Sequence, residues 1–138
     1  MEMLYPAKLS AEETGGYTIQ FVDLPEAYTE GDTVEETLFN AAEVLNLTLR
    51  GRIEESMDVP APSIGLADAH YIAPDAKTQA ALLLRQARGD RSYAEVARAL
   101  ETSWDVARRL EDPRHWPSLK SLDRAARVLG KRLVLSFT

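Results

Sequence analysis

Apolar and polar residues alternate with period two in the first third of the chain, a pattern typical of strands with one buried face. Tyr17, Ile19 and Phe21 share one such face, and the turn at Gly15-Gly16 indicates a hairpin with the strand before it. Four strands are predicted, three in this part of the chain and one further on. They cover residues 3–10, 17–22, 27–29 and 69–73.

A helical repeat separates the third predicted strand from the fourth. Apolar residues recur every three or four positions from about residue 34 to 50, and Gly51 marks the expected end. The sequence Thr33-Val34-Glu35-Glu36 is a capping box, in which the Thr33 hydroxyl accepts from the Glu36 amide and the Glu36 carboxylate reaches back to the Thr33 amide. The order is therefore β-β-β-α-β, with one helix covering one face of a small sheet.

Four shorter helical patterns follow Pro74-Asp75. Ser92-Tyr93-Ala94-Glu95 forms a second capping box, Asp112-Pro113 ends the third helix, and Ser118 caps the fourth. Short helices joined by tight turns have the proportions of a helix-turn-helix domain. The predicted helices cover about residues 76–88, 93–100, 104–110 and 119–129.

The end of the chain alternates again, with Leu133, Leu135 and Phe137 on one face, which predicts a short terminal strand. A single strand after four helices has no partner inside its own domain. Because unpaired strand edges are costly and a two-fold axis can pair a strand with its own copy, we expect these three residues to form a homodimer contact. The predicted fold class is thus α+β, with domains at residues 1–73 and 74–138.

Charge divides the chain at nearly the same place. Residues 1–75 contain 3 lysines and arginines against 15 acidic residues, whereas residues 76–138 contain 13 against 7. The net charges are −12 and +6. Such asymmetry indicates two different partners, and a basic half favours nucleic acid.

Several classes of protein are disfavoured by what the sequence lacks. It has no cysteine, no apolar run of the roughly 20 residues that cross a bilayer, and no signal-peptide pattern at its start, so we expect a cytoplasmic protein without a membrane contact. We find no nucleophile–base motif and no phosphate-binding glycine loop. Asp23 and Glu26 have no nearby third ligand for a metal. We therefore expect no cofactor, no metal and no enzyme activity.

The third helix of the basic half carries the residues expected to read DNA. In a helix-turn-helix, the second helix of the motif lies in the major groove, where arginine recognises guanine and aspartate accepts from cytosine. Ser92 and Tyr93, at a helix N-terminus, suit a phosphate contact. For Trp104, stacking on a thymine methyl and anchoring a core or dimer remain equally open. The predicted DNA-binding residues are Ser92, Tyr93, Ser103, Trp104, Asp105, Arg108, Arg109, Arg114 and Lys120, with His115 as a further backbone contact.

The run GYTIQFVDLPEA (16–27), the run TEGDTVEE (29–36), Asn40-Ala41 and Leu45 closely resemble the HicB antitoxin family. The second half resembles the Cro/repressor-type helix-turn-helix, with RLE (109–111) at the end of the recognition helix and PSLKSL (117–122) opening the next. Together the two resemblances cover nearly the whole chain.

The HicB resemblance implies a partial ribonuclease-H-like fold without its catalytic set. It also implies binding to a small basic HicA toxin, an mRNA-cleaving ribonuclease, together with repression of the operon that encodes both proteins. On this hypothesis an acidic surface around Asp23, Glu26, Glu30, Asp32 and the helix from Val34 contacts the toxin, since complementary fields steer association. Two alternatives remain open: a repressor whose acidic half binds a small effector, and a residual nuclease.

Overall fold

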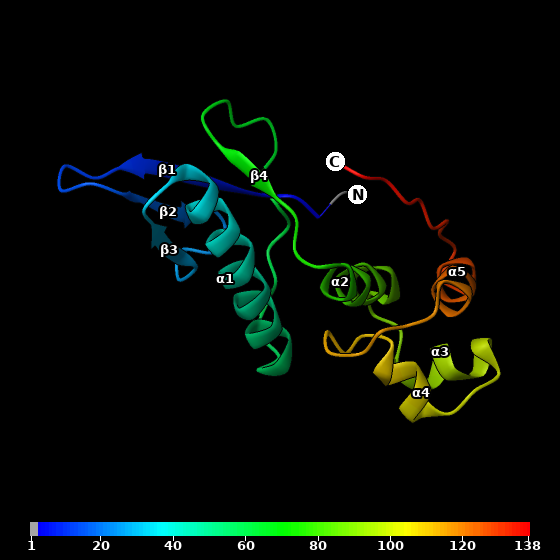
Figure 1. Cartoon of the computed structure of the whole chain (residues 1–138). Helices are drawn as coiled ribbons and strands as arrows, with labels where there is room; N and C mark the ends of the chain where they lie inside the picture. Colours follow the sequence, from blue (N-terminus) through cyan, green and yellow to red (C-terminus); the bar gives the residue numbers. More distant parts are fainter. Residues whose placement is uncertain (1–2) are drawn as a thin grey trace. The chain divides into compact units, whose positions relative to one another are not determined.

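The computed structural model describes residues 3–138 and has mixed α+β architecture, with a four-stranded antiparallel sheet and five helices (Figure 1). Met1 and Glu2, where the N-terminal sequence shows no signal-peptide pattern, lie outside the described residues. The chain divides into two compact units, which we call the N-terminal and C-terminal units. The first runs to Asp75 and the second from Ala76 to Thr138.

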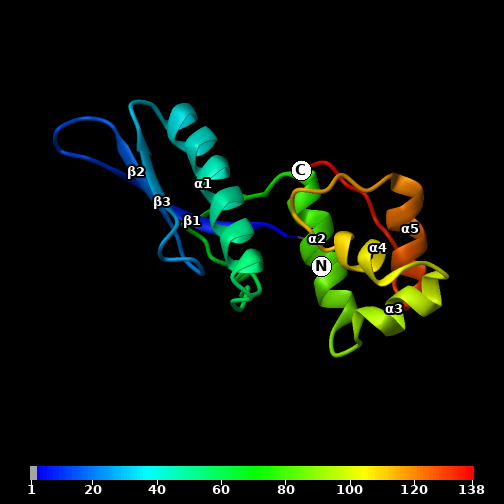
Figure 2. The same ribbon diagram turned by 90° about the horizontal axis from the view of Figure 1, so that it is seen from below.

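The N-terminal unit is built on strands β1 (Tyr5–Ala11), β2 (Tyr17–Phe21), β3 (Tyr28–Gly31) and β4 (His70–Ile72), in the spatial order β3-β2-β1-β4. The predicted hairpin is present, with Leu9 opposite Ile19 and Ala7 opposite Phe21. Because side chains alternate across a sheet, these four residues lie on one face. Helix α1 packs against β2 and β3 and covers that face (Figure 2).

Helix α1 (Val34–Glu54) buries Thr37, Ala41, Leu45 and Leu49, the residues four apart on one face. The Thr33 hydroxyl caps its first turn by accepting from the Glu36 amide at 3.1 Å, as the sequence predicts. The second half of the predicted capping box differs, because the Glu36 carboxylate accepts from the Asp32 amide instead of that of Thr33. This contact extends the cap into the turn that follows β3.

The predicted end of this helix at Gly51 is wrong, since the helix continues to Glu54. A glycine inside a helix costs roughly 1 kcal/mol relative to alanine. Contacts made by the next turn offset this cost. The Arg52 guanidinium donates to the Glu26 carboxylate and to the Asp58 carbonyl, and both partners lie outside the helix.

The C-terminal unit contains α2 (Ala76–Arg88), α3 (Tyr93–Leu100), α4 (Trp104–Arg109) and α5 (Leu119–Val128), close to the predicted ranges. Ser92, Ser103 and Ser118 each cap a helix by accepting from an amide three residues later. Helix α3 packs against α4 and α5, and α5 also packs against α2. The core consists of buried residues from all four helices and the turn after α4: Leu84, Val96, Ala97, Leu100, Ala107, Leu110, Ala125 and Leu129.

The predicted terminal strand is absent from the described chain, because residues 131–138 form neither strand nor helix. A strand is defined by hydrogen bonds to a neighbouring strand, and the sheet of this chain consists of β1–β4 alone. Leu133 is half-buried, whereas Leu135 and Phe137 are exposed. The predicted strand is thus a tail in which Leu135 and Phe137 of the predicted apolar face, and Val134 of the other face, are open to solvent.

Candidate nucleic-acid interface and acidic surface

Helix α4 exposes all five of its predicted DNA-reading residues. Its apolar anchors are Ala107, which is buried, and Leu110, which follows the helix and is buried as well. The opposite surface is polar and carries two arginines beside one aspartate. The predicted residues that are exposed are Ser103, Trp104, Asp105, Arg108 and Arg109, and Val106 is exposed as well.

Trp104 sits in a stack of aromatic and cationic side chains that spans three helices. Its ring meets the Tyr93 ring edge-on, with 5.6 Å between centroids and 86° between planes. The Arg108 guanidinium lies 6.0 Å from the Trp104 centroid, and the Arg88 guanidinium lies 4.3 Å from that of Tyr93. Such contacts stabilise by about 0.5–1 kcal/mol each at exposed sites. Trp104 remains 49% exposed and is therefore not a core residue.

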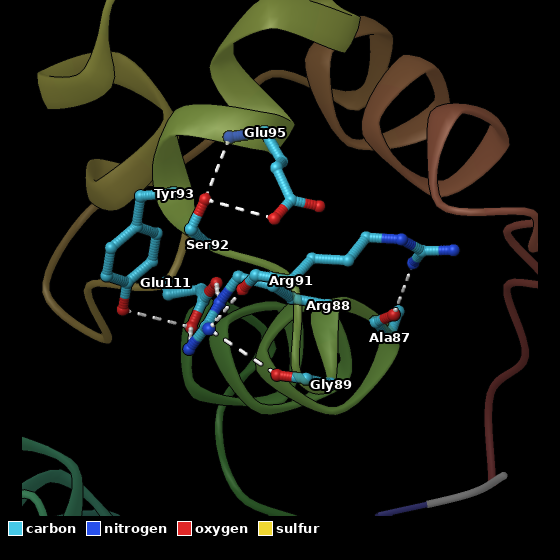
Figure 3. Close-up of polar contacts among 8 residues, drawn as sticks. All are labelled: Ala87, Arg88, Gly89, Arg91, Ser92, Tyr93, Glu95 and Glu111. Atoms are coloured by element: carbon cyan, nitrogen blue, oxygen red, sulfur yellow. Dashed lines mark hydrogen bonds and ion pairs between the residues drawn. The ribbon is translucent and has the colours of Figure 1, made fainter.

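A buried ion pair between Arg88 and Glu111 is joined to this stack through Arg88 and Tyr93 (Figure 3). The Arg88 guanidinium donates to both carboxylate oxygens of Glu111, at 2.6 and 3.1 Å, and the Tyr93 hydroxyl donates to the same carboxylate at 3.3 Å. Glu111 raises the pKa of Arg88, chiefly through this hydrogen bond. Burial raises the pKa of Tyr93, and the negative charge of Glu111 adds to that effect. The network joins the end of α2, the start of α3 and the turn after α4.

This network contains functional candidates that sequence reasoning missed. Arg88 and Glu111 are 23 positions apart, and no motif in either segment indicates their pairing. Arg91, in the turn before α3, is exposed and donates to the Ala87 carbonyl. Its basic side chain lies next to Ser92, where the sequence predicts a phosphate contact.

The remaining predicted DNA contacts occupy different parts of the C-terminal unit. Arg114 is exposed in the loop between α4 and α5, His115 beside it is half-buried, and Lys120 is exposed in the first turn of α5. The Ser92 hydroxyl is engaged as a helix cap, and the Tyr93 hydroxyl is bonded to Glu111. Any phosphate contact at the start of α3 therefore depends mainly on backbone amides.

In the N-terminal unit, two of the four predicted toxin-contacting carboxylates are engaged internally. Asp23 accepts from the Ser63 amide and hydroxyl at 2.8 and 2.6 Å and so anchors the segment before β4. Glu26 pairs with Arg52 through two hydrogen bonds, which lower the pKa of its carboxyl group. These bonds identify Asp23 and Glu26 as residues that hold the fold together.

Glu30 and Asp32 are exposed, as expected for a contact surface. Together with Glu12 and Glu36 they line an open pocket of about 590 Å³ between the β1–β2 turn and the start of α1. Within residues 3–138, no group of three or more histidine or carboxylate side chains is arranged to hold a metal ion. No helix in the same range is both long and apolar enough to cross a membrane.

Similarity to known proteins extends across both units. Residues 4–79 match the family model described as "HicB_like antitoxin of bacterial toxin-antitoxin system". Antitoxin HicB of Escherichia coli (strain K12) is 31% identical over 96% of this chain and 98% of its own length. Antitoxin HicB 2 of Photorhabdus laumondii is 34% identical over 96% and 95%, and antitoxin HicB of Pseudomonas fluorescens is 28% identical over 91% and 88%.

Proposed function

The chain belongs to the HicB-like antitoxin family of bacterial toxin–antitoxin systems, and from this premise we propose how its two units divide the work. The N-terminal unit binds and neutralises a small basic HicA-type toxin. The C-terminal unit represses the operon that encodes both proteins, and neither unit is catalytic. The observation that carries this proposal is the similarity to antitoxins over 96% of the chain, which includes both the acidic and the basic unit.

For the N-terminal unit we assign the sheet and α1 to a partial ribonuclease-H-like fold that holds the toxin without cutting RNA. Its net charge of −12 suits a basic partner, because opposite fields accelerate association and fix the docking orientation. Glu26, Glu30 and Asp32 are exposed among the four predicted acidic contacts, and of these Glu26 is paired with Arg52. Asp23 and Glu26 contribute by holding that surface in shape.

For the C-terminal unit we assign α3 and α4 to a helix-turn-helix in which α4 is the recognition helix. Support comes from the exposure of Asp105, Arg108 and Arg109 on one short helix braced against α3. On this assignment Arg108 and Arg109 read base edges. Ser92, Tyr93, Arg114 and Lys120 contact the DNA backbone, and Ser103 and Trp104 lie at the groove-facing end of α4.

We assign the exposed tail to dimerisation. Leu133, Leu135 and Phe137 would pair with the same residues of a second copy as an antiparallel strand, which satisfies the backbone groups of both tails. A two-fold dimer also presents two recognition helices to two half-sites of an operator. Two apolar side chains that stand open to solvent in the single chain support this assignment.

The toxin-binding half of the proposal is tested by co-expressing the chain with the small basic protein encoded beside its gene. We expect a stable complex on size-exclusion chromatography and relief of the toxin's growth arrest. If the adjacent gene product is not basic, or if the two proteins migrate separately, the antitoxin role assigned here is wrong for this pair.

The DNA-binding half is tested with Arg108→Ala on the operator region upstream of the gene. Loss of one bidentate base contact should weaken binding by about 1–3 kcal/mol and relax preference at one base position. Arg127→Ala is the matched control, because it removes an equal charge from an exposed arginine that pairs with Asp123 in α5. Equal losses in the two variants would show that α4 does not read sequence.

A further inference from the structure

The outward face of α1 carries two large apolar side chains that are exposed to solvent. Phe39 is 67% exposed and Leu47 is 66% exposed. They are eight residues apart, so they lie about 12 Å apart along the helix, with the exposed Glu43 between them. Residues spaced three and four apart share one side of a helix. We call Glu36, Phe39, Glu43 and Leu47 the α1 ridge.

The α1 ridge lies on the side of the helix opposite its buried face. The buried residues Thr37, Ala41, Leu45 and Leu49 face the sheet, and a helix turns about 100° per residue. Phe39 and Leu47 therefore do not contribute to the core of the N-terminal unit. A single exposed apolar residue is ordinary on a protein surface, but two on one helix face form the centre of a small contact patch.

The charge around the ridge is acidic. Glu35, Glu36 and Glu43 are exposed along this part of the helix. The two arginines of the later turns do not offset them, because Arg50 pairs with Asp75 at 2.7 Å and Arg52 pairs with Glu26 at 2.7 Å. An apolar centre surrounded by carboxylates is complementary to an apolar patch surrounded by lysines and arginines.

We infer that the α1 ridge docks the basic toxin, with Phe39 and Leu47 as the buried anchors and Glu36 and Glu43 as charged contacts at the rim. This inference rests on the proposed function. The sequence already places the helix from Val34 in the toxin-contact surface, and the structure adds Phe39 and Leu47 as its apolar centre. Asp23 and Glu26 are bound to Ser63 and Arg52, so part of the hydrogen-bonding capacity of their carboxylates is already used within the fold. The apolar anchors Phe39 and Leu47 require no exchange of such bonds, although the Glu36 carboxylate at the rim already accepts from the Asp32 amide.

The distribution of apolar surface favours the ridge over the acidic pocket near the β1–β2 turn. That pocket is lined mainly by Glu12, Glu30, Asp32 and Glu36 together with threonines and glycines, and Tyr17 is its single large apolar residue. Interfaces take most of their affinity from a few large side chains that become fully buried, whereas rim charges mainly affect association rate. Glu36 belongs to both surfaces, so the pocket extends the charged rim of the ridge.

The test compares Phe39→Ala/Leu47→Ala with wild type, using the purified basic protein encoded beside the gene as the probe in isothermal titration calorimetry. Loss of two anchors should weaken binding by at least roughly 30-fold. Ile64→Ala is the matched control, because it removes an apolar side chain that is 87% exposed in the loop before β4. It should change the Kd less than about threefold. Glu43→Gln should lower the association rate and reduce its dependence on salt.

Wild type that does not bind the probe overturns the proposed function and this inference together. Wild type that binds, with the double variant binding equally well, overturns the ridge alone. A double variant that loses self-association of the free antitoxin would show that a second copy occupies the ridge, which also overturns the inference. Far-UV circular dichroism should be unchanged, since substitution of exposed residues alters stability by about 0.5 kcal/mol or less.

Discussion

The ion pair between Arg88 and Glu111 should hold a large share of the stability of the C-terminal unit. Glu111→Gln removes the charge while keeping the shape. The Glu111 side chain is 8% exposed and that of Arg88 19%, and breaking a buried pair by removing one partner costs about 3–5 kcal/mol. In the variant, the Arg88 guanidinium still donates to the Arg91 carbonyl at 2.9 Å, and the glutamine side chain still offers one acceptor oxygen, so part of this cost is avoided. We therefore expect a loss of about 2–3 kcal/mol.

Such a loss is large for a unit of this size. A unit running from Ala76 to Thr138 has a total stability of about 3–9 kcal/mol at typical values per residue. The corresponding decrease in Tm is roughly 10–20 °C. Both tryptophans of the chain, Trp104 and Trp116, lie in the C-terminal unit. Thermal unfolding followed by tryptophan fluorescence therefore reports this unit in the intact protein.

The matched control is Glu101→Gln, which neutralises the partner of Arg124 in an exposed ion pair with 4.0 Å between the charged groups. Exposed pairs contribute about 1 kcal/mol or less, so the decrease in Tm should be a few degrees. If Glu111→Gln lowers Tm by no more than Glu101→Gln does, the buried pair does not stabilise the unit and the reasoning is wrong.

Two further predictions concern the N-terminal unit, both measured by urea unfolding followed with far-UV circular dichroism. Gly31→Ala should destabilise the N-terminal unit by roughly 3 kcal/mol, because a Cβ atom at this position would lie 2.8 Å from the Thr37 backbone nitrogen. Gly51→Ala is the control, since a Cβ atom there meets nothing within 4 Å. Burial raises the pKa of Tyr5 from 10.0 to about 12, so stability present below pH 10 should decline by about 2–3 kcal/mol as the pH rises to 12. Tyr5→Phe should lose about 1 kcal/mol of stability, because the hydrogen bond to the Pro60 carbonyl is removed. Its stability should also decline less than that of wild type between pH 9 and 12. An equal decline would show that other groups cause the pH dependence.

Local features of the fold were predictable because their causes are local. The hydroxyls of Thr33, Ser92 and Ser118 each lie three residues before the amide that they cap, so the first turn of each helix is encoded in four consecutive residues. Strand alternation and helix spacing likewise need only a short window. The end of α1 was not predictable, because the contacts that carry it past Gly51 involve Glu26 and Asp58.

In the candidate sites, features that depend on local spacing were predictable from the sequence, whereas contacts between distant residues were not. Exposure of Arg108 and Arg109 follows from helical spacing around Ala107 and Leu110. The partners of Asp23 and Glu111 lie 40 and 23 positions away, so no short window indicates that these carboxylates are internal. Phe39 and Leu47 read as ordinary helix residues in the sequence. The apolar spacing predicts the buried side of α1, and the burial of Ala41 and Leu45 confirms it; the exposed fractions of Phe39 and Leu47 come from the structure.

If the proposed dimerisation and repression hold, the exposed C-terminal tail would make repression a cooperative function of concentration. If the tail finds its hydrogen-bonding partner only in a second copy, the number of DNA-competent dimers varies with the square of the monomer concentration when dimers are scarce. Halving the antitoxin then leaves about a quarter of the dimers, by mass action. Two apolar side chains at the end of the chain would thus set how sharply the operon responds to a falling supply of its own antitoxin.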